Sequence, residues 1–386
     1  MVLHDSPRAA RVLIAGGGFA AVEAALALRA LAGERVRLTL ISPEPVLHYR
    51  PAATLEAVDD QAPLRYDLQA IAEDVGAEYH LGLVESVASQ RRTLRTASGA
   101  HLPYDALILA TGARASAGIP GALTFRDQRD VRLIRRVLAE VEVRAVRRVV
   151  FAVPSGCSWA LPIYELALLT AARAIELGVE AELSLVSAER DPLALFGAEA
   201  SRLVGELLAE RGVRFIGSAA ATGVRRDGAL MLQFDGAISA DRVVAVPELR
   251  GRRITGVPAS WWGFVPTDMC GRVESIEDVY AAGDMTTFPV KQGGLATQQA
   301  DRIAHTIAAG LGAPVKELRA GHVLQARLLG GPNPIVLRSE LDAWGRPTEA
   351  TLEHVDKSSA ATSAKVHARY LTPYLEKRRP ILSRAA

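Results

Sequence analysis

Apolar runs that end in glycine alternate with stretches of helical periodicity along most of the chain. RVLIAGGG begins the series as a buried strand, and FAAVEAALALRAL follows it with the spacing of a helix. The next apolar runs, RVRLTLIS and YDALILATGA, indicate two further buried strands. Uniformly apolar strands that are separated by helices are typical of parallel sheets covered on both faces. The pattern therefore predicts an α/β fold.

The same order of elements occurs a second time. VVFAVP precedes the helical IYELALLTAARAIELG, and the strand ELSLVSAE precedes the helical FGAEASRLVGELLAERG. The chain returns to a strand at VYAAGD and to a glycine-led helix at GGLATQQADRIAHTIAAG. We expect two three-layer, Rossmann-like dinucleotide-binding domains, the first formed by residues 1–115 and 262–312 and the second by residues 116–261. The alternation fades from about residue 313, and residues 313–386 are interpreted as a C-terminal α+β interface region.

Composition narrows the class of partner and the compartment. The chain has 386 residues, of which 49% are hydrophobic, and a formal net charge of +2, which gives no reason to expect a nucleic-acid partner. The N-terminus does not have the pattern of a signal peptide, and no apolar run reaches the ~18–20 residues of a membrane helix. The two cysteines lie outside any C-x-x-C motif, which argues against a disulfide scaffold or a zinc site. A soluble, cytoplasmic protein is therefore expected.

The C-terminal sequence ARYLTPYLEKRRPILSRAA leaves two alternatives open. Its mixture of aromatic, leucine and basic residues suits peripheral contact with the inner face of a membrane. It equally suits a helix packed at a domain interface or at the subunit interface of a homo-oligomer.

GGGFAA, directly after the first strand, fits the dinucleotide pattern G-x-G-x-x-A. Gly16 permits the tight turn, Gly18 lets backbone approach a diphosphate, and Ala21 allows close packing of the helix on the strand. The helix that begins at Phe19 and Ala20 directs free N–H groups toward the phosphates. The ribose partner has two candidates, because the second strand ends at Ser42 rather than at an acidic residue. The Ser42 hydroxyl or the nearby Glu44 can fill that place.

Two later motifs carry a family resemblance. ILATGA contains Ala110, Thr111 and Gly112, and VYAAGDMTTFPVKQGG contains Gly283 and Asp284. Together with GGGFAA they resemble the FAD-dependent pyridine nucleotide-disulfide oxidoreductase superfamily, which includes disulfide reductases, ferredoxin reductases, type II NADH dehydrogenases and sulfide:quinone oxidoreductases. The resemblance implies bound FAD, with Asp284 on the ribityl chain and Thr111 and Gly112 near the adenine-side phosphates.

The start of the late helix supports the same assignment on physical grounds. The N–H groups of Gly293, Gly294 and Leu295 can point at the N1–C2=O edge of a flavin, where negative charge collects on reduction. Lys291 would add a full positive charge in a chain where lysine is scarce, although a surface lysine is the alternative. Arg50, in VLHYRP, is a candidate for binding phosphate or flavin, with a salt bridge as the alternative.

The corresponding turn of the second domain, VPSGCSWALPIYE, departs from the dinucleotide pattern. Gly156 is its only glycine, and bulky residues crowd it, which disfavours NAD(P)H. This segment and PVKQGG resemble sulfide:quinone oxidoreductases and flavocytochrome c sulfide dehydrogenases. The resemblance implies a redox role for Cys157, whose thiolate would have a lowered pKa at a helix N-terminus, and proton handling by Glu165. Those enzymes use a cysteine pair, whereas Cys270 is the one other cysteine here.

These observations favour an FAD-dependent oxidoreductase of the sulfide:quinone-oxidoreductase kind. It would pass two electrons from a small donor, sulfide or another sulfur compound, through the flavin to a quinone or another acceptor. One alternative is an NAD(P)H-dependent flavin reductase of the ferredoxin-reductase or type II NADH dehydrogenase kind, with Glu189 as the ribose acid. Another is a flavin-bound electron-relay partner of a second protein.

Overall fold

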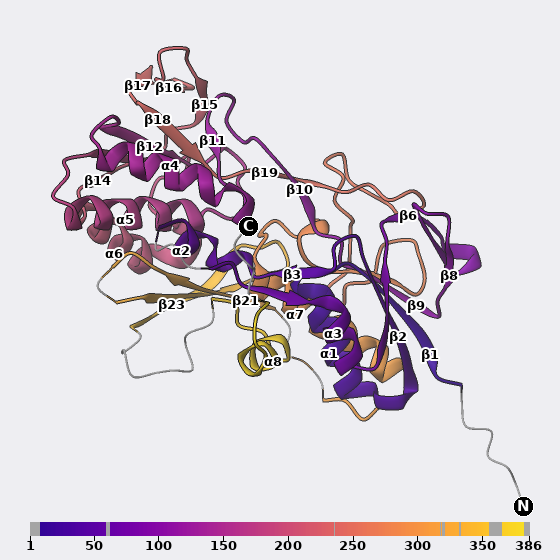
Figure 1. The fold of residues 1–386 in the computed structure, drawn as a ribbon. Coiled ribbons are helices and arrows are strands. Elements are labelled where there is room, and N and C mark those ends of the chain that lie inside the picture. Colours follow the sequence, from indigo (N-terminus) through magenta and orange to yellow (C-terminus); the bar gives the residue numbers. More distant parts are fainter. Residues whose placement is uncertain are drawn as a thin grey trace, which may run out of the picture.

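The chain forms two lobes, each built on a parallel five-stranded sheet (Figure 1). The computed structural model describes residues 8–58, 62–234, 236–316, 318, 321–331, 333–354 and 365–381. Helices cover one face of each sheet, and a small antiparallel sheet covers the other. The predicted α/β class with two Rossmann-like domains is confirmed.

The first lobe contains the sheet with strand order β20–β9–β1–β2–β5, in which every pair is parallel. Helices α1, α3 and α7 pack on one face, and the antiparallel sheet β6–β7–β8 packs on the other. The elements are β1 (Ala10–Ala15), α1 (Phe19–Ala32), β2 (Val36–Ser42), α3 (Leu68–Asp74), β5 (Ala77–Leu81), β6 (Val84–Ala88), β7 (Thr93–Thr96), β8 (His101–Pro103), β9 (Ala106–Leu109), β20 (Val279–Ala281) and α7 (Gly293–Gly310).

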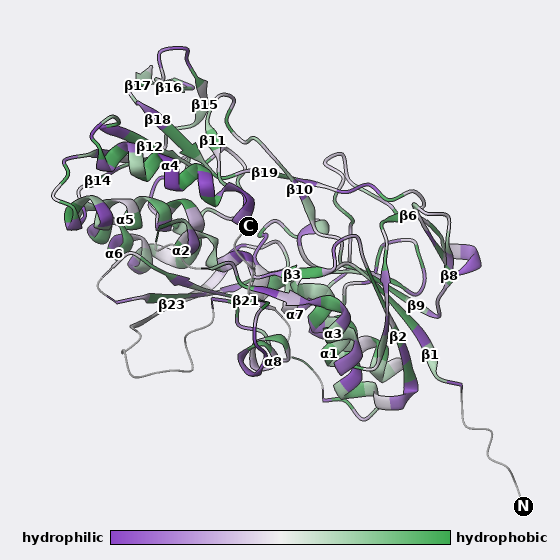
Figure 2. Cartoon of the chain, viewed as in Figure 1, coloured by the Kyte–Doolittle hydropathy of each residue, from purple (hydrophilic) through white to green (hydrophobic). Residues whose placement is uncertain are grey.

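The second lobe repeats the arrangement with strand order β11–β18–β12–β13–β14. Helices α4, α5 and α6 pack on one face, and the antiparallel sheet β15–β16–β17 packs on the other. Hydrophobic residues fill strands such as β18, whereas hydrophobic and hydrophilic residues alternate around α4 (Figure 2). The elements are β11 (Leu123–Thr124), α4 (Val131–Glu142), β12 (Arg148–Ala152), α5 (Leu161–Glu176), β13 (Glu182–Val186), α6 (Gly197–Glu210), β14 (Val213–Ile216), β15 (Ala221–Val224), β16 (Leu230–Leu232), β17 (Ala237–Ile238) and β18 (Arg242–Ala245).

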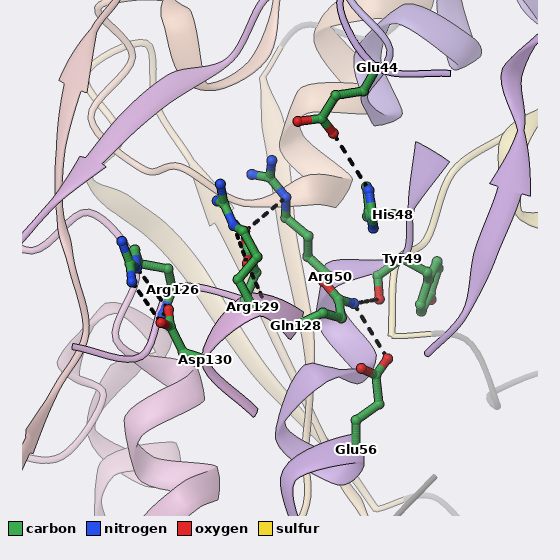
Figure 3. Close-up of polar contacts among 10 residues, drawn as sticks. Glu44, His48, Tyr49, Arg50, Glu56, Arg126, Gln128, Arg129 and Asp130 are labelled. Atoms are coloured by element: carbon green, nitrogen blue, oxygen red, sulfur yellow. Dashed lines mark hydrogen bonds and ion pairs between the residues drawn. The ribbon is translucent and has the colours of Figure 1, made fainter. Parts of the chain in front are cut away.

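Several connections hold the lobes together. The linker strands β10 (Ala113–Ser116) and β19 (Glu248–Gly251) form an antiparallel pair where the chain crosses between the lobes. Helix α2 (Ala53–Val58) comes from the first segment of the chain but joins the apolar core of the second lobe. A polar contact lies beside it (Figure 3), where the amide of Gln128 donates to the carbonyl of Tyr49 at 2.9 Å.

The C-terminal region forms a third small sheet and a helix. Strands β21 (His322–Leu328), β22 (Ile335–Leu341) and β23 (Pro347–His354) are antiparallel and pack against the helices of the second lobe. Helix α8 (Leu371–Lys377) instead packs on the first lobe beside α1. The tail helix therefore lies at an interface within the chain, one of the alternatives expected from the sequence, and residues 382–386 lie outside the described residues.

Candidate functional site

The predicted cofactor residues meet at the carboxyl edge of the first sheet. A Cβ atom on Gly16 would lie 2.1 Å from the carbonyl oxygen of Ala110, so the ends of β1 and β9 touch where a side chain would clash. Gly283 adopts a φ of 77°, and a Cβ atom there would lie 3.2 Å from Ala296 of α7 and 3.5 Å from Ala20 of α1. The motifs that are far apart in the sequence thus enclose one site, as Rossmann topology requires.

The N-terminus of α1 is open for an anion. Gly18 is the N-cap residue, no side chain caps the helix, and no atom lies within 4 Å of a Cβ built on Gly18. Behind it, Ala20 and Ala21 are buried against the sheet. Gly112 also borders open space, with a φ of 67°, while the Thr111 hydroxyl contacts the sulfur of Met285 at 3.6 Å. This cradle of glycines and free N–H groups fits the diphosphate of a dinucleotide.

Ser42 lies at the edge of this cradle, but its hydroxyl already has partners. The Oγ atom donates to the carbonyl of Glu44 at 2.7 Å and accepts from the Glu44 N–H at 3.2 Å. A hydroxyl has one donor and two acceptor positions, so one acceptor position is left for a ribose. Glu44 is exposed, and its carboxylate lies 3.5 Å from the ring of His48 (Figure 3).

Asp284 and Lys291 form the charged part of the site, whereas Arg50 lies 3.7 Å from the carboxylate of Asp127, the salt-bridge alternative expected from the sequence. Asp284 is half-buried, and no described residue donates a hydrogen bond to its carboxylate. Burial raises the pKa of Asp284, against the lowering effect of Lys291 and Arg50. Burial likewise lowers the pKa of Lys291 to about 8, against the effect of Asp284, and the ammonium donates to the carbonyl of Thr286. The unpartnered carboxylate fits a polyol such as the predicted ribityl chain.

The first turn of α7 lies next to the start of α1. A Cβ atom on Gly293 would lie 2.8 Å from the ring of Phe19, which itself packs on the ring of Tyr49 at a centroid distance of 5.5 Å. The side chain of Gln292 caps the helix and accepts from the N–H of Leu295 at 2.9 Å. The expectation that Leu295 offers its N–H to a flavin is therefore wrong, and in the described part of the chain the groups of Gly293 and Gly294 remain available.

Cys157 does not have the environment that the sequence suggested. Helix α5 begins only at Leu161, so the thiol is not at the helix N-terminus, and it packs on the apolar core of the second lobe. Burial raises its pKa to about 11, with a smaller raising effect of Glu189. The predicted lowering of this pKa is wrong in direction, because desolvation penalises the thiolate. The cysteine loop nevertheless reaches the first lobe, since Ser158 accepts from the backbone N–H of Lys291 at 3.3 Å.

The Glu165 carboxylate is occupied by partners other than Cys157. Its carboxylate is buried and accepts from the Lys365 ammonium at 2.7 Å, from the Thr54 hydroxyl at 2.8 Å and from the Leu329 N–H at 3.3 Å. Burial raises the pKa of Glu165, and Lys365 opposes that effect. The prediction that Glu165 handles protons beside Cys157 is therefore not supported, because its two oxygens are occupied by the ion pair with Lys365 and by the hydrogen bonds from Thr54 and Leu329.

The second turn leaves a cavity of about 120 Å³. Gly156 adopts a φ of 76° with no atom within 4 Å of a Cβ built there, so the turn is less crowded than its side chains suggested. Cys157, Trp159 and Glu189 line the cavity, and one oxygen of the Glu189 carboxylate is buried without a hydrogen-bond partner in the described chain. Ligand pockets usually measure ≈ 300–1,000 Å³, so this cavity admits a fragment rather than a dinucleotide.

Three residues at the site were missed from the sequence. Gln292 caps α7, Lys365 binds Glu165, and Glu23 accepts from the backbone N–H groups of the chain that precedes α8. Glu23 carried a readable signal, because it is the one acidic residue of the mostly apolar helix α1. The scarcity of lysine also pointed to Lys365, but no periodicity indicated its partner.

Comparisons with known proteins agree with this geometry. A family model described as pyridine nucleotide-disulphide oxidoreductase matches residues 10–310. The chain is 24% identical over 331 residues to a sulfide-quinone reductase of Aquifex aeolicus, and the match covers 78% of this chain and 76% of that protein.

Two solved structures resemble the fold. The sulfide:quinone oxidoreductase of Aquifex aeolicus superimposes with a TM-score of 0.76 at 20% identity, over 86% of this chain and 84% of that one. A ferredoxin reductase of Rhodopseudomonas palustris gives 0.67 at 22% identity, over 86% and 82%. Among the described helices, none combines the length and the apolar character needed to cross a bilayer.

Proposed function

The chain belongs to the pyridine nucleotide-disulphide oxidoreductase family, and from that premise we propose that it transfers two electrons from a small sulfur donor through FAD to a quinone or another acceptor. The assignment to FAD-dependent oxidoreductases is confirmed at the level of the family. The donor, the acceptor and the residues that hold FAD are what the proposal adds.

One contact carries the proposal. The backbone of Lys291, beside the predicted flavin site, donates to Ser158 in the loop that holds Cys157. The cysteine loop of the second lobe thereby contacts the segment that would face the flavin, and we assign the approach of the donor to this contact. The similarity to a sulfide-quinone reductase supports the same donor class.

Different residues of the site would bind different parts of FAD. The glycine turn and the N-terminus of α1 would hold the diphosphate, and Asp284 would accept from the ribityl hydroxyls. When bound, FAD supplies acceptance and release of two electrons. Lys291 and the free N–H groups at the start of α7 would stabilise the negative charge that reduction places on the ring.

The donor would have to reach the flavin without a cysteine pair. Cys157 and Cys270 are free, and Cys270 lies in a turn of the first lobe whose Asp268 accepts from its N–H. Cys157 holds a neutral thiol at physiological pH because its pKa is about 11. We therefore assign Cys157 to shaping the donor site, so that transfer of two electrons from the donor to bound FAD would not require a thiolate of this chain.

An NAD(P)H-dependent flavin reductase is the second candidate. The cavity at Gly156 and the unpartnered carboxylate of Glu189 lie where the second domain of a two-nucleotide enzyme would bind its coenzyme. The resemblance in fold to a ferredoxin reductase is consistent with that use. The size of the cavity argues against it.

Anaerobic reduction of the flavin separates the candidates. Purified protein loaded with FAD is mixed in a stopped-flow instrument with sulfide, small thiols, NADH or NADPH, and the flavin absorbance is followed. We expect saturable bleaching by a sulfur donor, with the Cys157→Ser variant changing the apparent affinity more than the limiting rate. Faster, saturable bleaching by NADH or NADPH would establish the second candidate and end the first.

A further inference from the structure

Two buried glutamates occupy equivalent positions in the two lobes. Glu23 is the fifth residue of α1, and Glu165 is the fifth residue of α5, each in the helix that follows the central strand of its sheet, β1 or β12. Their exposed fractions are 0% and 1%. A buried carboxylate requires compensation by hydrogen bonds or charge, so the partners of both residues identify what the fold holds in place.

Both glutamates bind the same short segment, residues 365–371, which we name the strap. Glu165 accepts from the ammonium of Lys365 at 2.7 Å, at one end of the strap. Glu23 accepts from the N–H groups of Tyr370 at 3.0 Å and Leu371 at 2.6 Å, at the other end. The strap is therefore fixed to the second lobe at its beginning and to the first lobe at its end.

Between these attachments the strap lies against the predicted flavin site. The N–H of Lys365 donates to the hydroxyl of Tyr49 at 3.1 Å. A Cβ atom on Gly293 would lie 3.2 Å from Val366, and one on Gly294 would lie 3.5 Å from the carbonyl oxygen of His367. The strap thus borders the first turn of α7 and the Phe19–Tyr49 pair.

We propose that Glu23 and Glu165 are positioning residues that clamp the strap across both lobes and so close the side of the flavin site at the start of α7. The inference rests on the proposed function for the identity of the cofactor, but the clamp itself does not depend on it. With the strap held, water and oxygen are kept from the flavin while the donor approaches from the cysteine loop.

The test uses three variants of the full-length protein. Lys365→Met leaves the Glu165 charge unpaired, whereas Glu165→Gln with Lys365→Met removes both charges and should recover thermal stability. Glu140→Gln with Arg242→Met is the matched control, because this ion pair of 2.8 Å lies within the second lobe, away from the strap. The hydrogen-exchange rate of residues 365–371 measures how firmly the strap is held. The rate at which oxygen reoxidises the reduced flavin measures the access of oxygen to the flavin site.

In both Lys365 variants we expect the hydrogen-exchange rate of the strap and the rate of flavin reoxidation to be about tenfold higher than in the control. The double variant should show the same increases although its thermal stability is recovered. Unchanged exchange would show that the pair does not hold the strap and would overturn the proposal. Raised exchange with unchanged reoxidation would also overturn it, because the strap would then be a structural tie only. Failure to bind FAD would refute the proposed function, while hydrogen exchange would still decide the clamp.

Discussion

The two strand–turn–helix units of this chain share their topology but differ in what stands before the helix. In the first lobe, α1 begins at Phe19, directly after the glycines that follow β1. In the second lobe, residues 153–160 separate β12 from α5, and Pro162 lies in the first helical turn. The first unit offers bare backbone to an anion. The second places side chains and a small cavity in the same position.

From this difference we infer that the turn of the first lobe can bind a diphosphate, whereas the equivalent turn of the second lobe cannot. Parallel strands bring their carboxyl ends together in both lobes, so the location of a site is fixed by topology. The residues of the turn decide whether a diphosphate, a small fragment or nothing fits there. The buried glutamate four residues into each helix is present in both units, which indicates that its role concerns the strap and not the turn.

The largest effect is expected from placing an acid in each turn. Gly18→Asp supplies a favourable N-cap that occupies the free N–H groups and repels the diphosphate, so FAD affinity should fall at least about 100-fold with the fold intact. Gly156→Asp is the matched variant, because aspartate tolerates the left-handed conformation there. The FAD content of each variant is measured as the flavin absorbance per chain after purification. Equal losses in the two variants would contradict the asymmetry between the turns.

The second effect concerns the thiol that the second turn holds. With a pKa of about 11, Cys157 should be alkylated at pH 8 about 100-fold more slowly than an ordinary thiol, and the rate should rise about tenfold per pH unit until about pH 11. The Cys270→Ser protein isolates this thiol, and Cys157→Ser serves as the control. Mass spectrometry after timed exposure to iodoacetamide measures the rate. Rapid alkylation at pH 8 would restore the reactive thiolate that the sequence suggested.

The sequence predicted the features that depend on apolar periodicity and on glycine spacing. It located the strands and helices that flank the glycine-rich turns of both lobes, but not β5, α3, β11, β14 or β18, and it placed Gly16, Thr111, Asp284 and Lys291 on the turns and loops of one lobe. It predicted a C-terminal α+β region without locating its strands, although β21 alternates strictly between buried and half-buried residues, because that signal is short and β22 begins in a mostly apolar run. The role of Glu165 could not be predicted, since its partner Lys365 is far away in the chain.

The third effect concerns Glu23, the counterpart of Glu165 without a lysine partner. Burial raises its pKa to about 7, so the folded protein binds more protons than the unfolded chain between about pH 4.5 and 7. This residue should therefore add stability that is fully present below about pH 4.5 and lost as the pH rises through about 7. In the Glu23→Gln variant, the fall in the free energy of unfolding between pH 5 and pH 8 should be smaller by about 2 kcal/mol.

Urea unfolding at pH 5 and at pH 8 compares the wild type with this variant. Glu140→Gln is the control, because its carboxylate pairs with Arg242 within the second lobe, away from Glu23 and the strap. The same pH dependence in wild type and Glu23→Gln would assign the titration to other groups.

The smallest effect is expected at Lys291, and it tests whether the open first turn belongs to a flavin site. Lys291→Met removes a buried positive charge beside Asp284, so reduced flavin should lose about 1–2 kcal/mol of stabilisation, a fall of about 20–40 mV in the two-electron potential. Because the lysine is charged only below its pKa of about 8, the difference between wild type and variant should be full at pH 6.5 and shrink above pH 8. Potentials measured against indicator dyes at several pH values provide the check. Lys316→Met is the comparison, since that side chain lies outside the site, and equal shifts in both variants would mean that Lys291 does not act on the flavin.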